Sequence, residues 1–197
     1  MAKAPQAGHA KTRLIPLLGA AGAARLAQRM LDHAVAQACA ANLGDVVELC
    51  CTPDPTHPAF TAHAAHGVRL SAQGEGDLGV RMHAALARAL AQAPRAILIG
   101  TDIPALDAAY LRAAAAALDD PAIDVVLGPA ADGGYTLVGL RRAAPQLFDA
   151  MPWSTGRVLA LTRERLAASG LRHVELAPLC DVDEPADLAD LPAGWLS

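Results

Sequence analysis

Short apolar runs alternate along the 197-residue chain with longer segments in which apolar residues recur at helical spacing. The apolar runs predict strands at 46–52, 68–70, 96–99, 124–128, 135–140 and 173–176. The helical spacing predicts helices at 22–41, 59–65, 78–90, 108–118 and 158–166. Because strands and helices alternate throughout, we expect an α/β protein, a three-layer α/β/α sandwich with a mainly parallel sheet, as a single domain over residues 1–197.

The strand predicted at 96–99 is followed at once by the sequence G-T-D-I-P. Asp102 therefore stands at the carboxyl end of a buried strand, the edge at which open α/β sheets bind ligands. A carboxylate held there is suited to Mg²⁺ or Mn²⁺, which prefer hard oxygen ligands. Two interpretations remain open, because an aspartate in this position also caps turns and helices.

Composition and charge argue against a nucleic-acid-binding protein and against a membrane-spanning one. The net charge of −4 argues against a general nucleic-acid-binding surface. No apolar run approaches the roughly 18 residues that span a bilayer, and no apolar leader follows Met1, so we expect a cytoplasmic protein without a membrane partner. The four cysteines lack C-x-x-C spacing, which predicts buried free thiols rather than a metal site or disulfides.

The amino end is locally basic, since the first acidic residue is Asp32 and both lysines of the chain precede it. Residues 4–14 form a predicted loop in which Gly8 lets backbone N–H groups approach a ligand closely. Lys11, Thr12 and Arg13 add two cations and a hydroxyl, a combination suited to phosphate. The Walker spacing is absent, and a solvated basic terminus is the alternative.

Six motifs in order along the chain carry a resemblance to a known family. They are K-A-P-x-x-G-x-x-K-T-R-L (3–14), Q-G-x-G-D-L-G-x-R-M (73–82), G-T-D-I-P (100–104), A-D-G-G-Y-x-L-x-G-L (131–140), P-W-S-T (152–155) and D-V-D-E-P-A-D-L (181–188). Together they resemble the DUF2064 family of the GT-A superfamily of nucleotide-diphospho-sugar transferases. Some members of that family are named as arsenosugar-biosynthesis or radical-SAM-associated glycosyltransferases.

The resemblance implies a nucleotide site built from two segments. Lys11 and Arg13, with Gly8 and Thr12 in the same loop, resemble the residues that receive the nucleotide phosphates. The segment bordering base and ribose is similar to Gln73, Gly76, Asp77 and Arg81. Asp77 is also expected to cap the helix at 78–90 and to pair with Arg81.

The resemblance also implies metal and acceptor residues. Asp102 resembles the metal-binding aspartate, although the D-x-D of glycosyltransferases is absent and G-T-D-I-P is closer to the G-D-x-P of nucleotidyltransferases. Asp183 is a candidate second metal ligand, with helix capping as the alternative. The acceptor side is expected at Asp132, Gly133 and Gly134, and in a pocket lined by Trp153, Ser154 and Thr155, unless Trp153 is simply core.

Relatives have an apolar strand immediately before the K-A-P loop, where this sequence has only Met1-Ala2. We therefore expect the first strand to be missing, through a misplaced start or a truncation, which would open a cleft beside the loop and expose sheet edges. The oligomeric state is not predicted.

The expected function is a Mg²⁺- or Mn²⁺-dependent glycosyl transfer, with Asp102, Asp132 and Lys11 as catalytic residues, from a nucleotide-diphospho-sugar to a small-molecule acceptor. The alternatives are nucleotidyl transfer from a nucleoside triphosphate, with release of pyrophosphate, and nucleotide binding without catalysis.

Overall fold

The computed structural model describes residues 1–43 and 46–196. The chain divides into two compact units, one made of Met1–Ala72, Gly100–Ala108 and Cys180–Ser197, the other of Gln73–Ile99 and Ala109–Leu179. Each unit contains its own open sheet, so the predicted α/β class is confirmed. That the whole chain forms one domain stays a prediction.

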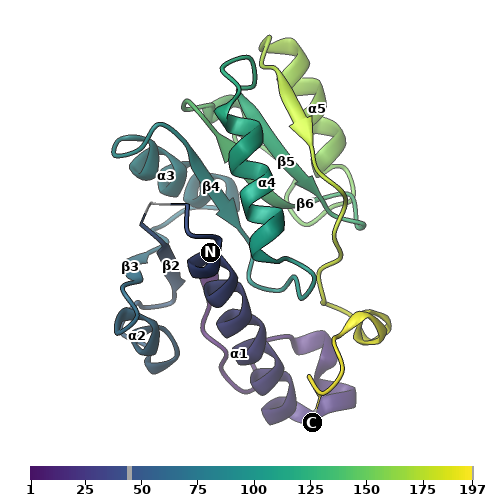
Figure 1. Cartoon of the computed structure of the whole chain (residues 1–197). Coiled ribbons are helices and arrows are strands. Elements are labelled where there is room, and N and C mark those ends of the chain that lie inside the picture. Colours follow the sequence, from purple (N-terminus) through teal and green to yellow (C-terminus); the bar gives the residue numbers. More distant parts are fainter. Residues whose placement is uncertain (44–45, 197) are drawn as a thin grey trace. The chain divides into compact units, whose positions relative to one another are not determined.

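The first unit contains a parallel sheet in the order β1-β2-β3, of which β2 and β3 are labelled in Figure 1. Its elements are β1 (Ala2–Lys3), β2 (Glu48–Thr52), β3 (Arg69–Ala72), α1 (Ile15–Ala41), α2 (Pro58–Ala64) and the 3₁₀ helices η1 (Thr12–Leu14) and η3 (Pro185–Asp190). Leu31 of α1, Phe60 of α2 and Leu49 of β2 are buried in one apolar cluster. Both helices therefore pack on this sheet.

The beginning of the first unit departs from two expectations. The first strand, expected to be missing, is present as the two residues of β1, and Ala2 and Ala4 around it are buried. Helix α1 begins at Ile15, earlier than the periodicity predicted, and Gly19, with the non-helical angles φ 68° and ψ 165°, separates its first turn from the rest of the helix by a kink. A glycine adopts that backbone conformation without steric cost.

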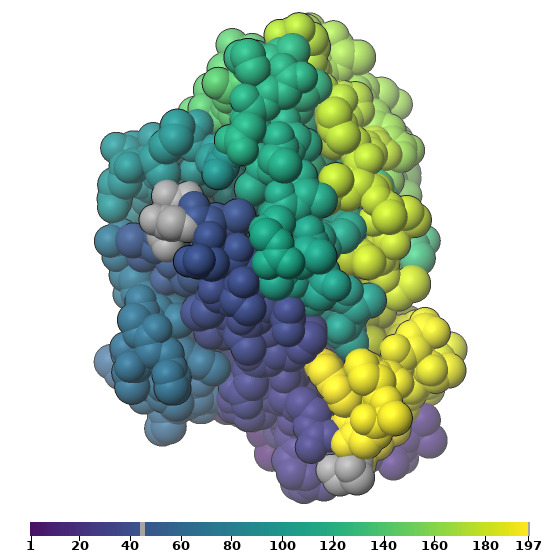
Figure 2. Space-filling model, viewed as in Figure 1, coloured from purple at the N-terminus to yellow at the C-terminus, as the bar shows by residue number. Residues whose placement is uncertain are grey.

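The second unit contains a mixed sheet in the order β4-β6-β5-β7. Its elements are β4 (Ala96–Ile99), β5 (Val125–Pro129), β6 (Tyr135–Leu140), β7 (His173–Glu175), α3 (Leu78–Leu90), α4 (Ala108–Asp119), α5 (Val158–Ala168) and the 3₁₀ helix η2 (Pro145–Leu147). Helix α4 lies in front of the strands in Figure 1, and its Leu118 reaches Gly139 of β6. The outer face of α4 is part of the surface seen in Figure 2.

Strand β6 runs antiparallel to both of its neighbours, β4 and β5. For the pair with β5 the reason is the short connection of residues 130–134, which is too brief for the crossover that a parallel pair needs. The other described pairs, β1 with β2, β2 with β3 and β5 with β7, are parallel. The sheets are thus mainly parallel, as predicted, with one inserted hairpin strand.

All four cysteines are free thiols, as predicted, but burial holds only for Cys50 and Cys51 of β2, because Cys39 and Cys180 are exposed. Among the described residues, no helix has the length and apolar character needed to cross a bilayer.

Candidate functional site

The loop between β1 and η1 is an ordered turn closed by its own backbone. Ala4 N donates to Thr52 O of β2 at 2.8 Å, and His9 N and Ala10 N both donate to Gln6 O. Lys11 then adopts a left-handed backbone conformation, with φ 44° and ψ 50°. This region is uncommon for residues with a side chain, and such strain gathers at functional sites.

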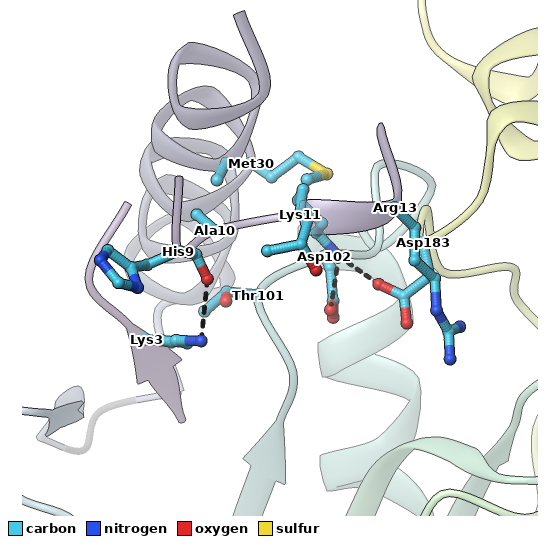
Figure 3. A pocket seen from close by; sticks show the side chains of 11 residues that line it. Lys3, His9, Ala10, Lys11, Arg13, Met30, Thr101, Asp102 and Asp183 are labelled. Atoms are coloured by element: carbon cyan, nitrogen blue, oxygen red, sulfur yellow. Dashed lines mark hydrogen bonds and ion pairs between the residues drawn. The ribbon is translucent and has the colours of Figure 1, made fainter. Parts of the chain in front are cut away.

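The side chain of Lys11 joins two carboxylates that are remote in sequence. Its Nζ donates to Asp102 Oδ2 at 2.9 Å and to Asp183 Oδ1 at 2.6 Å (Figure 3). Only 11% of the Lys11 side chain is exposed, against 38% for Asp102 and 47% for Asp183. The ammonium is therefore the buried centre of the cluster, and the carboxylates form its more accessible side.

Two opposing effects act on the Lys11 ammonium. Burial alone would lower the pKa of Lys11, because it removes water from the charged form. The charges and hydrogen bonds of Asp102 and Asp183 outweigh burial and raise that pKa above its ordinary value. The side chain of Lys11 is thus protonated and positively charged at neutral pH.

Backbone contacts bring the two aspartates together. Val182 N donates to Asp102 O at 2.9 Å, and the Val182 side chain is buried among Leu14, Leu26 and Met30. That contact places Asp183, the next residue, beside Asp102. The segment after strand β4 and the chain's last acidic segment therefore meet through one hydrogen bond and one buried valine.

Asp183 does not cap the helix that follows it. The N-cap of η3 is Glu184, and the side chain that stabilises this turn is Asp187, whose Oδ2 accepts from Asp183 N at 2.9 Å and from Glu184 N at 2.7 Å. The carboxylate of Asp183 is directed to Lys11 instead. Sequence reasoning missed Asp187 as a positioning residue, although its spacing from Glu184 matches a capping box.

A cavity of about 290 Å³ opens at this cluster. It is lined by Lys3, His9, Ala10, Lys11, Thr12, Arg13, Ala27, Met30, Thr101, Asp102 and Asp183. Of the predicted nucleotide-binding residues of the loop, Lys11, Thr12 and Arg13 line it, whereas Gly8, with φ 82°, does not. Arg13 Nη1 lies 3.2 Å from Glu184 Oε1, so both cations of the loop contact the acidic segment.

The residues present fit a divalent cation. Two carboxylate oxygens converge on one point, and a positive charge, the Lys11 ammonium, stands there. No group of three or more His, Cys, Asp and Glu side chains in the described part of the chain has the arrangement of a metal site. Two carboxylates suffice for Mg²⁺, which takes its other ligands from water and substrate phosphates.

The predicted base and ribose segment lies in the second unit. Asp77 caps α3, as predicted, with its Oδ1 accepting from Val80 N at 2.9 Å. Gln73 is buried, Gly76 has φ 99°, and the Nε of Arg81 is buried without a hydrogen-bond partner. Their role toward a nucleotide stays a prediction.

The predicted acceptor residues also lie in the second unit, around one turn. Asp132 is exposed, and its Oδ1 accepts from Gly134 N at 2.8 Å. Gly133, with φ 87°, packs directly on the backbone of Gly156. The P-W-S-T segment immediately precedes Gly156 in sequence, so the structure brings the two predicted acceptor motifs together.

Within that segment, Trp153 is largely a packing residue. Its ring meets Tyr135 edge-on, with centroids 6.3 Å apart and an interplanar angle of 87°. Its indole also lies against Gly79 of α3, and its Nε1 is buried without a hydrogen-bond partner. Ser154 is exposed with φ 62°, and Thr155 Oγ1 donates to Pro152 O at 2.8 Å.

Comparison with solved structures places this fold among transferase-like proteins. A crystal structure from Desulfovibrio desulfuricans G20, described as a "putative nucleotide-diphospho-sugar transferase", is 30% identical, covers 92% of this chain and 79% of its own, and gives a TM-score of 0.82. CMP:2-keto-3-deoxy-manno-octonic acid synthetase in complex with CTP is 18% identical, covers 82% and 85%, and gives a TM-score of 0.57, a likeness of fold alone.

No curated protein matches the sequence. A family model for the "uncharacterized protein conserved in bacteria (DUF2064)" matches residues 23–155, which include Asp102 and the turn at Asp132. Lys11 and Asp183 lie outside the matched residues. Because the match covers more than half of the sequence, the chain belongs to the DUF2064 family.

Proposed function

We propose that this chain is a transferase that uses a nucleotide-activated donor, moving a sugar from a nucleotide-diphospho-sugar to a small acceptor in a metal-dependent reaction. The single observation that carries the proposal is the meeting of Lys11 with Asp102 and Asp183 at a cavity. The 30% identical relative from Desulfovibrio desulfuricans G20, with its description, supports the donor class.

The residues around the cavity suit a diphosphate leaving group. Lys11 and Arg13 supply two cations, and Thr12 a hydroxyl, against the negative charge that develops as the sugar–phosphate bond breaks. Asp102 and Asp183 would hold a divalent cation. When bound, that ion supplies charge neutralisation on the phosphate oxygens and so makes the nucleoside diphosphate a better leaving group.

For the acceptor we propose a role for Asp132, as the family resemblance implies. In the proposed step an acceptor hydroxyl attacks the anomeric carbon, the bond from that carbon to the phosphate oxygen breaks, and the nucleoside diphosphate leaves with the bonding electrons. Asp132 is the proposed group that takes the hydroxyl proton, since its carboxylate is exposed next to two glycines.

Nucleotidyl transfer is the second candidate, and two observations favour it. The fold is similar to that of a synthetase crystallised with CTP, and Asp102 stands alone in G-T-D-I-P without a second aspartate of D-x-D type. In that reaction a nucleophile on the acceptor attacks the α-phosphorus of a nucleoside triphosphate, and pyrophosphate leaves. Nucleotide binding without catalysis is the third possibility.

A thermal-shift screen tests the proposal. Nucleotide-sugars and nucleoside triphosphates are each added with and without Mg²⁺ or Mn²⁺, and a ligand at about 100 times its Kd stabilises the folded state by about 2.7 kcal/mol. For a chain of this length that corresponds to a rise in Tm of roughly 5–10 °C. The leaving group, nucleoside diphosphate or pyrophosphate, is then identified in turnover with a candidate acceptor.

Matched variants make the screen specific for the cavity. Asp102→Asn removes one carboxylate of the pair, whereas Asp190→Asn makes the same change at an exposed position of η3 outside the cavity. We expect the metal-dependent shift to disappear in the first variant and to persist in the second. A shift that survives Asp102→Asn would refute the metal role, and the absence of any shift in the wild type would favour a non-catalytic protein.

A further inference from the structure

The ammonium of Lys11 occupies the position between the carboxylates of Asp102 and Asp183. The Lys11 Nζ touches both carboxylates, and the dashed lines in Figure 3 converge on it from Asp102 and Asp183. A divalent cation bound by both carboxylates would need the space and the charge that the ammonium now provides. The metal and Lys11 are therefore alternative partners of the same two oxygens.

A second ion pair repeats the arrangement one step further along the loop. Arg13 contacts Glu184 at 3.2 Å, beside the contact of Lys11 with Asp183. Asp187 accepts hydrogen bonds from the backbone N–H groups of Asp183 and Glu184, so both carboxylates are presented to the loop from one hydrogen-bonded turn.

A metal ion or a phosphate that binds this cluster alone leaves charges of the protein unbalanced. A metal ion between Asp102 and Asp183 displaces Lys11 and leaves a nearly buried ammonium without a carboxylate partner. A phosphate that takes Lys11 without a metal leaves the two carboxylates facing one another. The first state leaves a nearly buried charge without a partner, and the second places two like charges side by side, so each ligand alone meets a penalty that the other ligand relieves.

We propose that a divalent cation and a phosphate group bind this site cooperatively, because Lys11 exchanges its carboxylate partners for the phosphate when the metal enters. The inference rests on the proposed function and adds to it a coupling between the two ligands. No bond is made or broken, since the exchange replaces one set of ion pairs with another. The coupling is reciprocal, so the metal strengthens phosphate binding by the same factor.

The test measures binding of Mn²⁺ by electron paramagnetic resonance at neutral pH, with and without inorganic phosphate, which binds Mn²⁺ only weakly in solution. In the wild type we expect phosphate to raise the Mn²⁺ affinity about tenfold. In Lys11→Gln the competing charge is gone. We therefore expect tighter Mn²⁺ binding without phosphate, by about the same factor, and little further gain when phosphate is added.

Two further variants separate the effect of Lys11 from general electrostatics and from folding. Arg25→Gln removes a positive charge from an exposed position of α1 that does not line the cavity, and we expect wild-type Mn²⁺ affinity and coupling. Lys11→Arg keeps the charge, and we expect it to retain weak Mn²⁺ binding without phosphate. Circular dichroism confirms that each variant is folded before the titration.

The outcomes separate this inference from the proposed function. If wild-type protein binds a nucleotide-sugar with metal while Lys11→Gln binds Mn²⁺ no more tightly, the coupling is wrong and the function stands. If the coupling is found but no nucleotide binds, the function is wrong and the coupling stands. If no variant binds Mn²⁺, the coupling and the metal role are both refuted.

Discussion

Replacing Gly133 by alanine tests whether the turn at Asp132 depends on contact between two backbones. Gly133 has φ 87°, and a Cβ at this position would lie 2.3 Å from Gly156 O and 2.8 Å from Gly156 C and Cα. Its carbonyl also accepts from Leu159 N at 2.8 Å, so the turn is tied to the start of α5. The methyl group therefore meets backbone atoms of the turn just before α5, which give way less readily than the end of a flexible side chain.

The expected cost has two parts. A left-handed backbone conformation costs a residue with a Cβ about 1–2 kcal/mol. Forcing an extra methyl into a packed contact adds about 1–3 kcal/mol. We expect Gly133→Ala to lower the free energy of unfolding by about 2–5 kcal/mol, the sum of the two parts, which for a chain of this length means a fall in Tm of roughly 4–20 °C.

Gly170 provides the control for strain alone, because it has φ 62° and no atom within 4 Å of the Cβ that alanine would add. Gly170→Ala should lose only about 1–2 kcal/mol. Both variants are unfolded by urea and by heat and followed by circular dichroism. If Gly133→Ala loses no more stability than Gly170→Ala, the backbone contact with Gly156 contributes nothing, and the reasoning is refuted.

Three further predictions concern other parts of the chain. Gly79→Ala would place a Cβ 2.5 Å from Phe148 O, so we expect a loss of about 1–3 kcal/mol in urea unfolding. Asp187→Ala should cost about 1 kcal/mol and weaken Mn²⁺ binding, because Asp183 loses its positioning contact; an unchanged Mn²⁺ titration would contradict this. Burial raises the pKa of Cys51 from 9.0 to about 11, so the folded protein holds the thiol proton more tightly than the unfolded chain. That stabilisation is complete below pH 9 and is lost as pH rises through 11, and unfolding across this range should show a steeper loss in the wild type than in Cys51→Ala.

Local pattern was enough for most of the secondary structure. The strand Ala96–Ile99 and the helix Leu78–Leu90 have the predicted bounds, and Asp77 caps that helix as expected. These elements are set by short-range chemistry, namely apolar periodicity and a side-chain oxygen placed before the first turn. The start of α1 was wrong because the periodic apolar face does not reveal a helix that continues past the break at Gly19.

The order and direction of the strands in the second sheet could not be predicted from local sequence patterns. The alternation of strands and helices predicted parallel neighbours, yet β6 enters between β4 and β5 in the antiparallel sense. Only the short turn at 130–134 hinted at a hairpin, and the place of β6 between β4 and β5 depends on pairing with β4, a strand distant in sequence that no local pattern identifies as its neighbour.

The sequence by itself determined the fold class, the family and the residue types from which the candidate site is built. It named Lys11, Asp102 and Asp183, because each lies in a motif or at a strand end whose chemistry is visible locally. Only the tertiary structure decided that these side chains meet, since Lys11 and Asp183 are 172 residues apart. The physical reason is that an ion pair between distant segments depends on where folding brings the backbone. Here that place is set by the hydrogen bond from Val182 to Asp102 and by the turn that Asp187 holds.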